Sequence, residues 1–199
     1  APQPSPVPGL AYEEAFFSNA KYNPSVPTPD SVLGFPVGSR PATHTQIEAV
    51  FKALAAKSPR CKLLVYGKTH EGRALYYLVI ASEANLSSLD SLKADLARFA
   101  DPRKVSKEEG DRLAATLPAV AWMAYAIHGD EMSGSDAALA IAYHLAAGAD
   151  AEVTNLLDKL VVIIDPLMNP DGRDRFLAMQ AQNRTVQPSV DDQSLLHTG

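Results

Sequence analysis

A histidine and a glutamate stand close together in one short stretch of the 199-residue chain. His128 and Glu131 lie in AIHGDEMSGSDAAL, between an apolar run and an alanine-rich run. Imidazole nitrogens and carboxylate oxygens are ligands of catalytic Zn²⁺, which keeps one coordination position for water. Because that water loses its proton near neutral pH while the ion polarises a carbonyl oxygen, the pair indicates metal-dependent hydrolysis.

A purely structural interpretation of the pair stays open. His128 could cap the helix predicted after it or pair with Asp130, and this spacing of histidine and glutamate occurs by chance in many chains. Its position favours a metal site, because ligands gather where the strands of open α/β sheets end. Gly129 leaves the turn uncrowded, and Gly134 is expected to let backbone or substrate approach closely.

A second polar segment follows a later apolar run, in VVIIDPLMNPDGRDRF. Asn-Pro and Asp-Gly are turn-forming pairs, so this segment predicts a tight reversal after a strand, at Asn169, Pro170, Asp171 and Gly172. Such a reversal is expected to lie beside the His128 loop.

Apolar periodicity predicts the elements that position these residues. A helix is predicted after a cap at Thr43 or Thr45, and a hairpin in CKLLVYGKTHEGRALYYLVIAS. Further helices are predicted at SLDSLKADLARF, SGSDAALAIAYHLAAGA and AEVTNLLDKL, with apolar strands at AVAWMAYAI and VVIIDPLM. Apolar strands that alternate with helices are typical of a covered sheet, so the predicted fold class is α/β.

Composition excludes several classes of protein. The chain is 46% hydrophobic and 21% charged, as globular domains are. With a net charge of −5 and no basic patch, nucleic acid is not an expected partner. No apolar run approaches the ~18 residues of a membrane helix, so membrane insertion is not expected either. Cys61 is the only cysteine, which excludes an intramolecular disulfide and a multi-thiolate metal site.

The first 41 residues hold nine of the fifteen prolines, which disfavours long helices and central strands there. Apolar anchors predict an arm that lies against the domain: Tyr12, Phe16, Phe17, Tyr22, Leu33 and Phe35. The predicted organisation is an arm over 1–41 and a domain over 42–199. The start at Ala1 indicates either an artificial boundary or a mature end left by removal of a secretory signal.

Three segments in this order, GKTHEGRALYYLVI, AIHGDEMSGSDAAL and IIDPLMNPDGR, resemble the zinc carboxypeptidase family of carboxypeptidases A and B. The likeness covers residues 22–175, and the segment from 22 is similar to the secreted bacterial branch. The resemblance implies a mixed, mostly buried sheet with helices on both faces. It places the first two zinc ligands on His128 and Glu131 and a structural hairpin signature on Gly67, Glu71, Gly72 and Arg73.

The likeness also has departures. Digestive carboxypeptidases tend to carry an arginine just before the ligand glutamate, whereas this chain has Asp130, which leaves the shape of the outer subsites open. The family's third ligand, its Asn-Arg substrate clamp and its general base find no match, so the catalytic residues are expected beyond Gly199. The chain is therefore expected to be the N-terminal half of a catalytic domain, inactive alone. The other histidines, His44, His70, His144 and His197, are not expected to complete the site. His197 and Arg184 could border the cleft.

Three functions follow from the resemblance. The first is a secreted or periplasmic metallocarboxypeptidase that uses Zn²⁺ to remove C-terminal residues from peptides or proteins. The second is a zinc amidase of the same fold that deacylates small amino-acid conjugates, and the third is a non-catalytic relative that binds peptides. The preferred C-terminal residue and the oligomeric state do not follow from the sequence.

Overall fold

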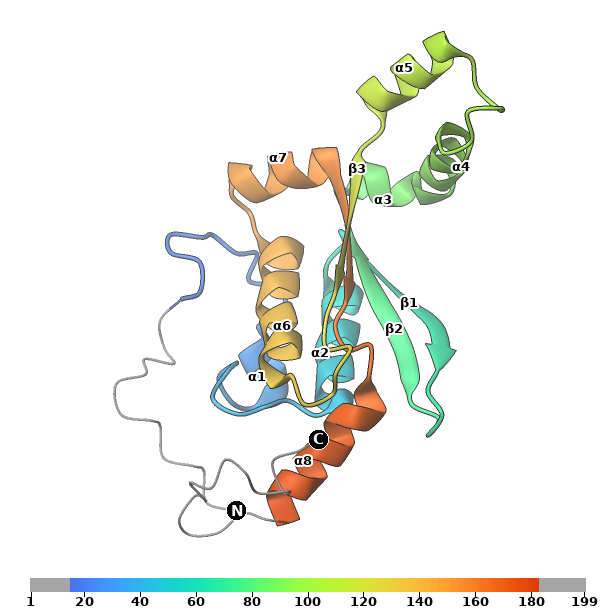
Figure 1. The fold of residues 1–199 in the computed structure, drawn as a ribbon. Helices are drawn as coiled ribbons and strands as arrows, with labels where there is room; N and C mark the ends of the chain where they lie inside the picture. The colour runs from blue at the N-terminus through green and yellow to red at the C-terminus, as the bar shows by residue number, and fades with distance from the viewer. Residues whose placement is uncertain (1–14, 183–199) are drawn as a thin grey trace.

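Four strands form one mixed sheet in the order β1-β2-β4-β3 (Figure 1). The structure is a computed structural model, and it describes residues 15–182. β1 (Cys61–Lys68) and β2 (Ala74–Ile80) form an antiparallel hairpin, and β2 also pairs antiparallel with β4 (Leu160–Asp165). β3 (Ala119–Ala124) pairs parallel with β4. The carboxyl ends of β3 and β4 therefore meet at one end of the sheet.

Helices precede β1, connect β2 to β3 and β3 to β4, and follow β4. Within the described residues they are α1 (Pro29–Leu33), α2 (His44–Lys57), α3 (Glu83–Ser87), α4 (Leu89–Phe99), α5 (Lys107–Thr116), α6 (Met132–Ala147), α7 (Ala151–Lys159) and α8 (Pro170–Gln182). Over residues 15–182, none of them combines the length and the apolar character needed to cross a membrane.

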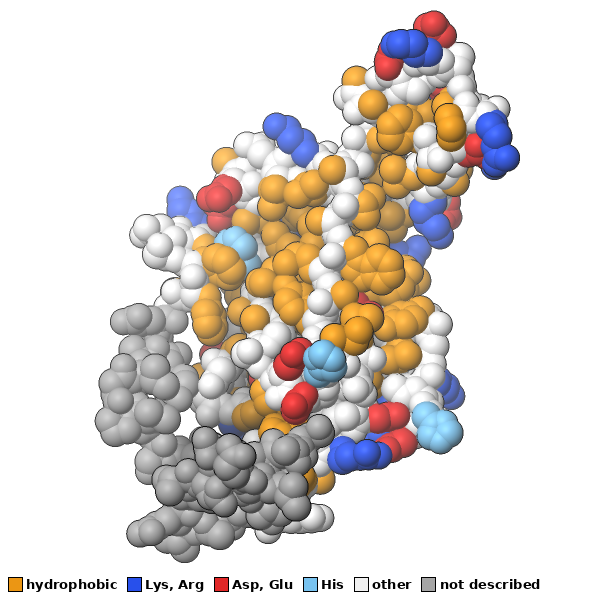
Figure 2. Space-filling view, in the orientation of Figure 1, with side chains coloured by type: hydrophobic (Ala, Val, Ile, Leu, Met, Phe, Trp, Pro, Cys, Tyr) orange, Lys and Arg blue, Asp and Glu red, His pale blue; other side chains and the backbone are white. Residues whose placement is uncertain are grey.

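Helices contact both faces of the sheet, as expected for this fold class. α2 and α6 lie on one face (Figure 1), where the largest core forms around fully buried side chains that include Phe51, Leu78 and Ile164. On the other face a smaller cluster forms where α3 and α4 pack against Val79 and Val161. This second face is only partly covered, and exposed apolar side chains remain around β3 (Figure 2).

Local signals explain where the elements begin. Thr43 caps α2 through a capping box with Gln46, so the first of the two predicted caps is the one used. The predicted hairpin forms with Gly72 at φ 84° in its turn, a conformation that glycine adopts without strain.

The predicted reversal after β4 is wrong. The chain enters α8 at Pro170 instead, and the side chain of Asn169 accepts a 2.9 Å hydrogen bond from the N–H of Gly172. Asparagine followed by proline is frequent at helix N-termini as well as in turns, and here it begins a helix. The proline-rich segment contains one short helix, α1, with Pro29 in its first turn.

Residues before position 42 contribute to the main core. Leu33 and Phe35 are buried in the same cluster as the strands. Phe17 stacks on the ring of His144 with 3.7 Å between centroids, and the hydroxyl of Tyr22 lies 3.1 Å from Nδ1 of that histidine. Phe16 is exposed, and Tyr12 lies outside the described residues.

Candidate metal centre

The two predicted ligands meet in the loop between β3 and α6. Nδ1 of His128 lies 3.1 Å from Oε1 of Glu131, and the two side chains are 71% and 61% exposed. The hydrogen bond that Glu131 accepts from His128, together with the negative charge of Glu131, raises the pKa of His128 above its ordinary value. The loop thus presents an imidazole and a carboxylate at one exposed point of the surface.

Backbone hydrogen bonds hold this loop to the segment after β4. The N–H of Met168 donates to the carbonyl of Tyr125 at 3.0 Å, and the N–H of Asn169 donates to the carbonyl of Ala126 at 3.1 Å. Ala126 adopts a φ of 51°, a left-handed conformation that costs a non-glycine residue about 1–2 kcal/mol. The surrounding bonds therefore hold the chain in a strained conformation two residues before His128.

Gly129 permits a direct contact between two backbones. A Cβ atom at this position would lie 2.1 Å from the carbonyl carbon of Gly172 and 2.2 Å from the nitrogen of Arg173. A Cβ at Gly134 would instead meet a carbon of the Tyr125 ring at 3.6 Å, which is ordinary contact. The close approach expected at Gly134 is therefore found at Gly129, where only glycine fits.

The hairpin signature is bonded to the start of α8. Arg73 donates from Nη1 to Oδ1 of Asp171 at 2.7 Å and from Nε to Oδ2 of Asp174 at 2.9 Å. Thr69 donates to the same Oδ1 of Asp171 at 2.8 Å. Although desolvation raises the pKa of Asp171, these donors outweigh it and hold that pKa below its usual value. The three segments of the resemblance are thus one connected structure, since Gly172 in turn contacts Gly129.

A buried ion pair lies beneath the loop, and sequence reasoning missed it. Arg173 is fully buried, and its Nη2 donates to Oδ2 of Asp136 on α6 at 3.0 Å. Its Nη1 donates to the carbonyl of Met132 at 2.9 Å, and its Nε donates to the carbonyl of Ala42 at 2.7 Å. Burial raises the pKa of Asp136, and the charge of Arg173 opposes that rise. An aspartate among the small and apolar residues of α6 is the signal that could have revealed the pair.

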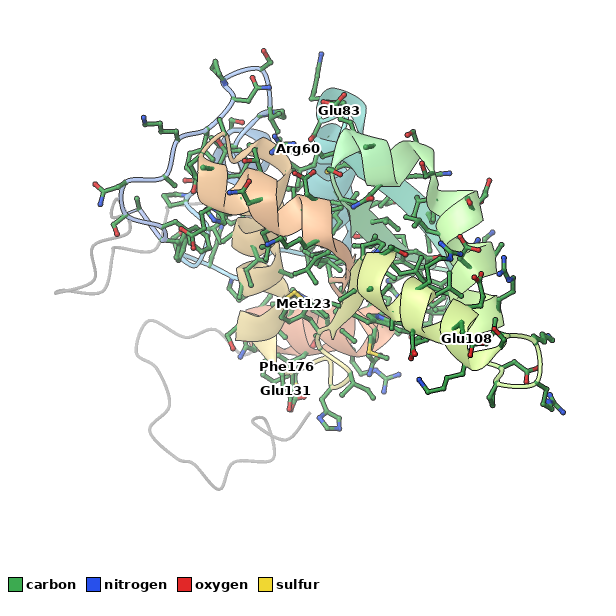
Figure 3. All side chains as sticks on the ribbon, turned by 90° about the horizontal axis from the view of Figure 1, so that it is seen from above. Arg60, Glu83, Glu108, Met123, Glu131 and Phe176 are labelled. Atoms are coloured by element: carbon green, nitrogen blue, oxygen red, sulfur yellow. The ribbon has the colours of Figure 1, made fainter. Side chains whose placement is uncertain are left out.

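A hollow of about 440 Å³ opens beside His128. Asp130 and Asn169 line it, and Arg175 and Phe176 line it from α8. Glu131 lies at the start of α6, in the same region of the view as Phe176 and far from Arg60 (Figure 3). The hollow therefore offers polar, cationic and aromatic groups next to the His128–Glu131 pair.

The remaining histidines of the described part of the chain do not join this pair. Nε2 of His44 lies 3.0 Å from the carbonyl oxygen of Ala74, His70 is exposed in the hairpin turn, and His144 lies against Phe17. Among residues 15–182, no cluster of three His, Cys, Asp or Glu side chains could hold a metal.

Three expectations about the site concern positions that the structure does not describe. His197 and Arg184, which could border the cleft, lie outside residues 15–182, and so does Gly199. The third ligand and the general base are not found among the described residues as a cluster with His128 and Glu131. Their placement beyond Gly199 therefore stays a prediction.

The pair fits zinc in the type and proximity of its donors. A neutral imidazole and a carboxylate are ligands that Zn²⁺ accepts, and catalytic sites commonly use three protein ligands. His128 and Glu131 would supply two of them. Because a proton competes with the ion for the imidazole, the raised pKa of His128 means that metal affinity should increase with pH.

Comparisons with known proteins give one family and one fold. The family model described as zinc carboxypeptidase matches residues 47–191. Carboxypeptidase A from Helicoverpa armigera is similar in structure, with 20% identity and a TM-score of 0.50 over 75% of this chain and 32% of that one. Thrombin activatable fibrinolysis inhibitor is similar with 16% identity and a TM-score of 0.46 over 80% of this chain and 31% of that one.

The chain spans about a third of the length of these two structures. The likeness to the Helicoverpa armigera carboxypeptidase A, at this identity, supports the carboxypeptidase-like α/β fold. A search of curated proteins finds no match.

Proposed function

Because the chain belongs to the zinc carboxypeptidase family, we propose that it is part of a metallocarboxypeptidase in which His128 and Glu131 hold Zn²⁺. The observation that carries this proposal is the 3.1 Å approach of Nδ1 of His128 to Oε1 of Glu131 at the carboxyl end of β3. Ligands of open α/β sheets gather at this end. The substrates would be the C-termini of peptides or proteins, at a secreted or periplasmic location.

The residues of the loop have separate roles in this proposal. His128 and Glu131 would place the ion beside the 440 Å³ hollow, where a peptide could approach it. The bound ion would supply a water of lowered pKa and polarise the scissile carbonyl. Arg175 and Phe176 offer a cation and a ring to the peptide on the α8 side of the hollow. The remaining zinc ligand and the general base would come from outside residues 15–182.

The test is hydrolysis by the full-length protein of synthetic peptides with blocked N-termini, followed by mass spectrometry. We expect release of single C-terminal residues, loss of that release with a zinc chelator, and recovery on addition of Zn²⁺. His128→Ala and Glu131→Gln should abolish release, whereas His70→Ala, which removes an exposed histidine of the hairpin turn, should leave it unchanged.

Two results would contradict the proposal and identify the alternatives. Cleavage of N-acyl amino acids without cleavage of peptides would indicate a deacylase of the same fold. Peptide binding without zinc uptake and without hydrolysis would indicate a non-catalytic relative.

A further inference from the structure

Arg173 has an unusual set of partners for a residue outside the metal-ligand pair. It is fully buried, and its guanidinium donates to two backbone carbonyls and to the carboxylate of Asp136. One of these carbonyls belongs to Met132, the first residue of α6 and the residue directly after Glu131. A buried arginine therefore fixes the chain immediately next to one of the two proposed ligands.

Arg173 and its neighbour Gly172 also contact the chain next to the other proposed ligand, His128. Gly129, which follows His128, packs its Cα directly against the backbone of Gly172 and Arg173. Residues 172 and 173 thus contact the chain directly after His128, at Gly129, and directly after Glu131, at Met132. The backbone of residues 172 and 173 makes the contact with Gly129, and the side chain of Arg173 makes the hydrogen bond to Met132.

We propose that Arg173 is a positioning residue for the metal, which sets the distance and direction between His128 and Glu131 through the Met132 carbonyl. The inference rests on the proposed zinc-binding function. The guanidinium suits this role because its N–H groups point in several directions within one rigid plane. Three acceptors can therefore be held at fixed relative positions. Lysine could satisfy the charge of Asp136 but not the geometry.

A contribution to stability alone does not account for this arrangement. Replacing a buried ion pair with uncharged residues of similar volume is often neutral or stabilising. Asp136 could accept the hydrogen bond from the N–H of Ala42, now 3.0 Å at Oδ1, equally well as an asparagine. What the uncharged pair would lose is the bonds from Arg173 to the carbonyls of Ala42 and Met132, and the second of these lies directly after Glu131. Groups that orient metal ligands typically contribute 10–100-fold to metal affinity.

The test uses the double variant Arg173→Met plus Asp136→Asn in the full-length protein, because it removes both buried charges together. Binding of Co²⁺ is followed by its visible absorption, which reports ligand geometry, and thermal unfolding is followed by circular dichroism. The matched control is Arg60→Met. Arg60 donates to the carbonyl of Gly148 at 2.6 Å and so holds the opposite end of the same helix, α6.

We expect the double variant to fold and to bind Co²⁺ about 10–100-fold more weakly, with an altered absorption band. Arg173→Lys should fold and also bind Co²⁺ more weakly than the unmodified protein, whereas Arg60→Met should match it. Unchanged Co²⁺ affinity and an unchanged spectrum in the folded double variant would overturn the positioning role of Arg173 but not the proposed zinc function. Failure of the unmodified protein to bind Co²⁺ would overturn the proposed zinc function, and the positioning role with it.

Discussion

A single methyl group at Gly129 should disrupt the candidate site, while the same change at Gly134 should not. In Gly129→Ala the new Cβ would lie 2.1 Å from the carbonyl carbon of Gly172, whereas ordinary carbon contacts lie at about 3.5–4.0 Å. The two backbones must therefore separate by about 1.5 Å. Overpacking of this kind costs about 1–3 kcal/mol, and we expect the upper end because backbone atoms, not flexible side chains, must move.

Gly134→Ala is the matched control because it adds the same group five residues away. Its Cβ would meet the ring of Tyr125 at 3.6 Å, and replacing glycine by alanine within a helix gains about 0.5 kcal/mol. Urea unfolding of both variants, followed by circular dichroism, measures the difference, and calorimetry measures zinc binding. We expect Gly129→Ala to lose stability and zinc affinity and Gly134→Ala to keep both. Equal stability and equal zinc affinity in the two variants would refute the contact between Gly129 and Gly172.

Two further predictions concern buried titratable groups. Burial raises the pKa of Cys61 to about 11, so its alkylation at pH 8 should be at least about a hundredfold slower in the folded protein than in urea; equal rates would contradict its burial. Burial also raises the pKa of Asp165, despite a 2.7 Å hydrogen bond from Tyr66, so its ionisation opposes folding. The unfolding free energy should therefore fall, relative to Asp165→Asn, as the pH rises from about 4 through the raised pKa, and then stay lower. Urea unfolding at several pH values measures this difference, and a constant difference would contradict the shift.

Much of the fold follows from local signals in the sequence. The apolar run of β3 and the alanine-rich run of α6 are both long enough to be recognised, so the loop between them could be placed at the end of a strand. That placement is what suggested that His128 and Glu131 meet, and the structure brings their donor atoms within 3.1 Å. Residues three apart in one loop need no long-range information to be paired.

The start of α8 shows where local signals become ambiguous. Asn169 and Pro170 are frequent in turns and also at helix N-termini, because both uses need a side-chain acceptor followed by a fixed φ. The bonds from the hairpin to Asp171 are among the contacts that distinguish the two uses. A single sequence does not contain that information.

The supports of the site depend on contacts between distant segments. Arg173 and Asp136 are 37 residues apart in the chain, and Gly129 meets Gly172 across a similar separation. No periodic pattern pairs such residues, because their meeting depends on how β3 and β4 align in the sheet. The sequence therefore indicated the candidate ligands but not the residues that hold them in place.

The most direct measurement is anomalous diffraction at the zinc absorption edge from crystals of the full-length protein grown with Zn²⁺. We expect one strong peak between the ring of His128 and the carboxylate of Glu131, about 2.0–2.2 Å from a nitrogen of the first and an oxygen of the second. A peak elsewhere in the molecule, or none at this loop, would contradict the assignment of these two residues as zinc ligands.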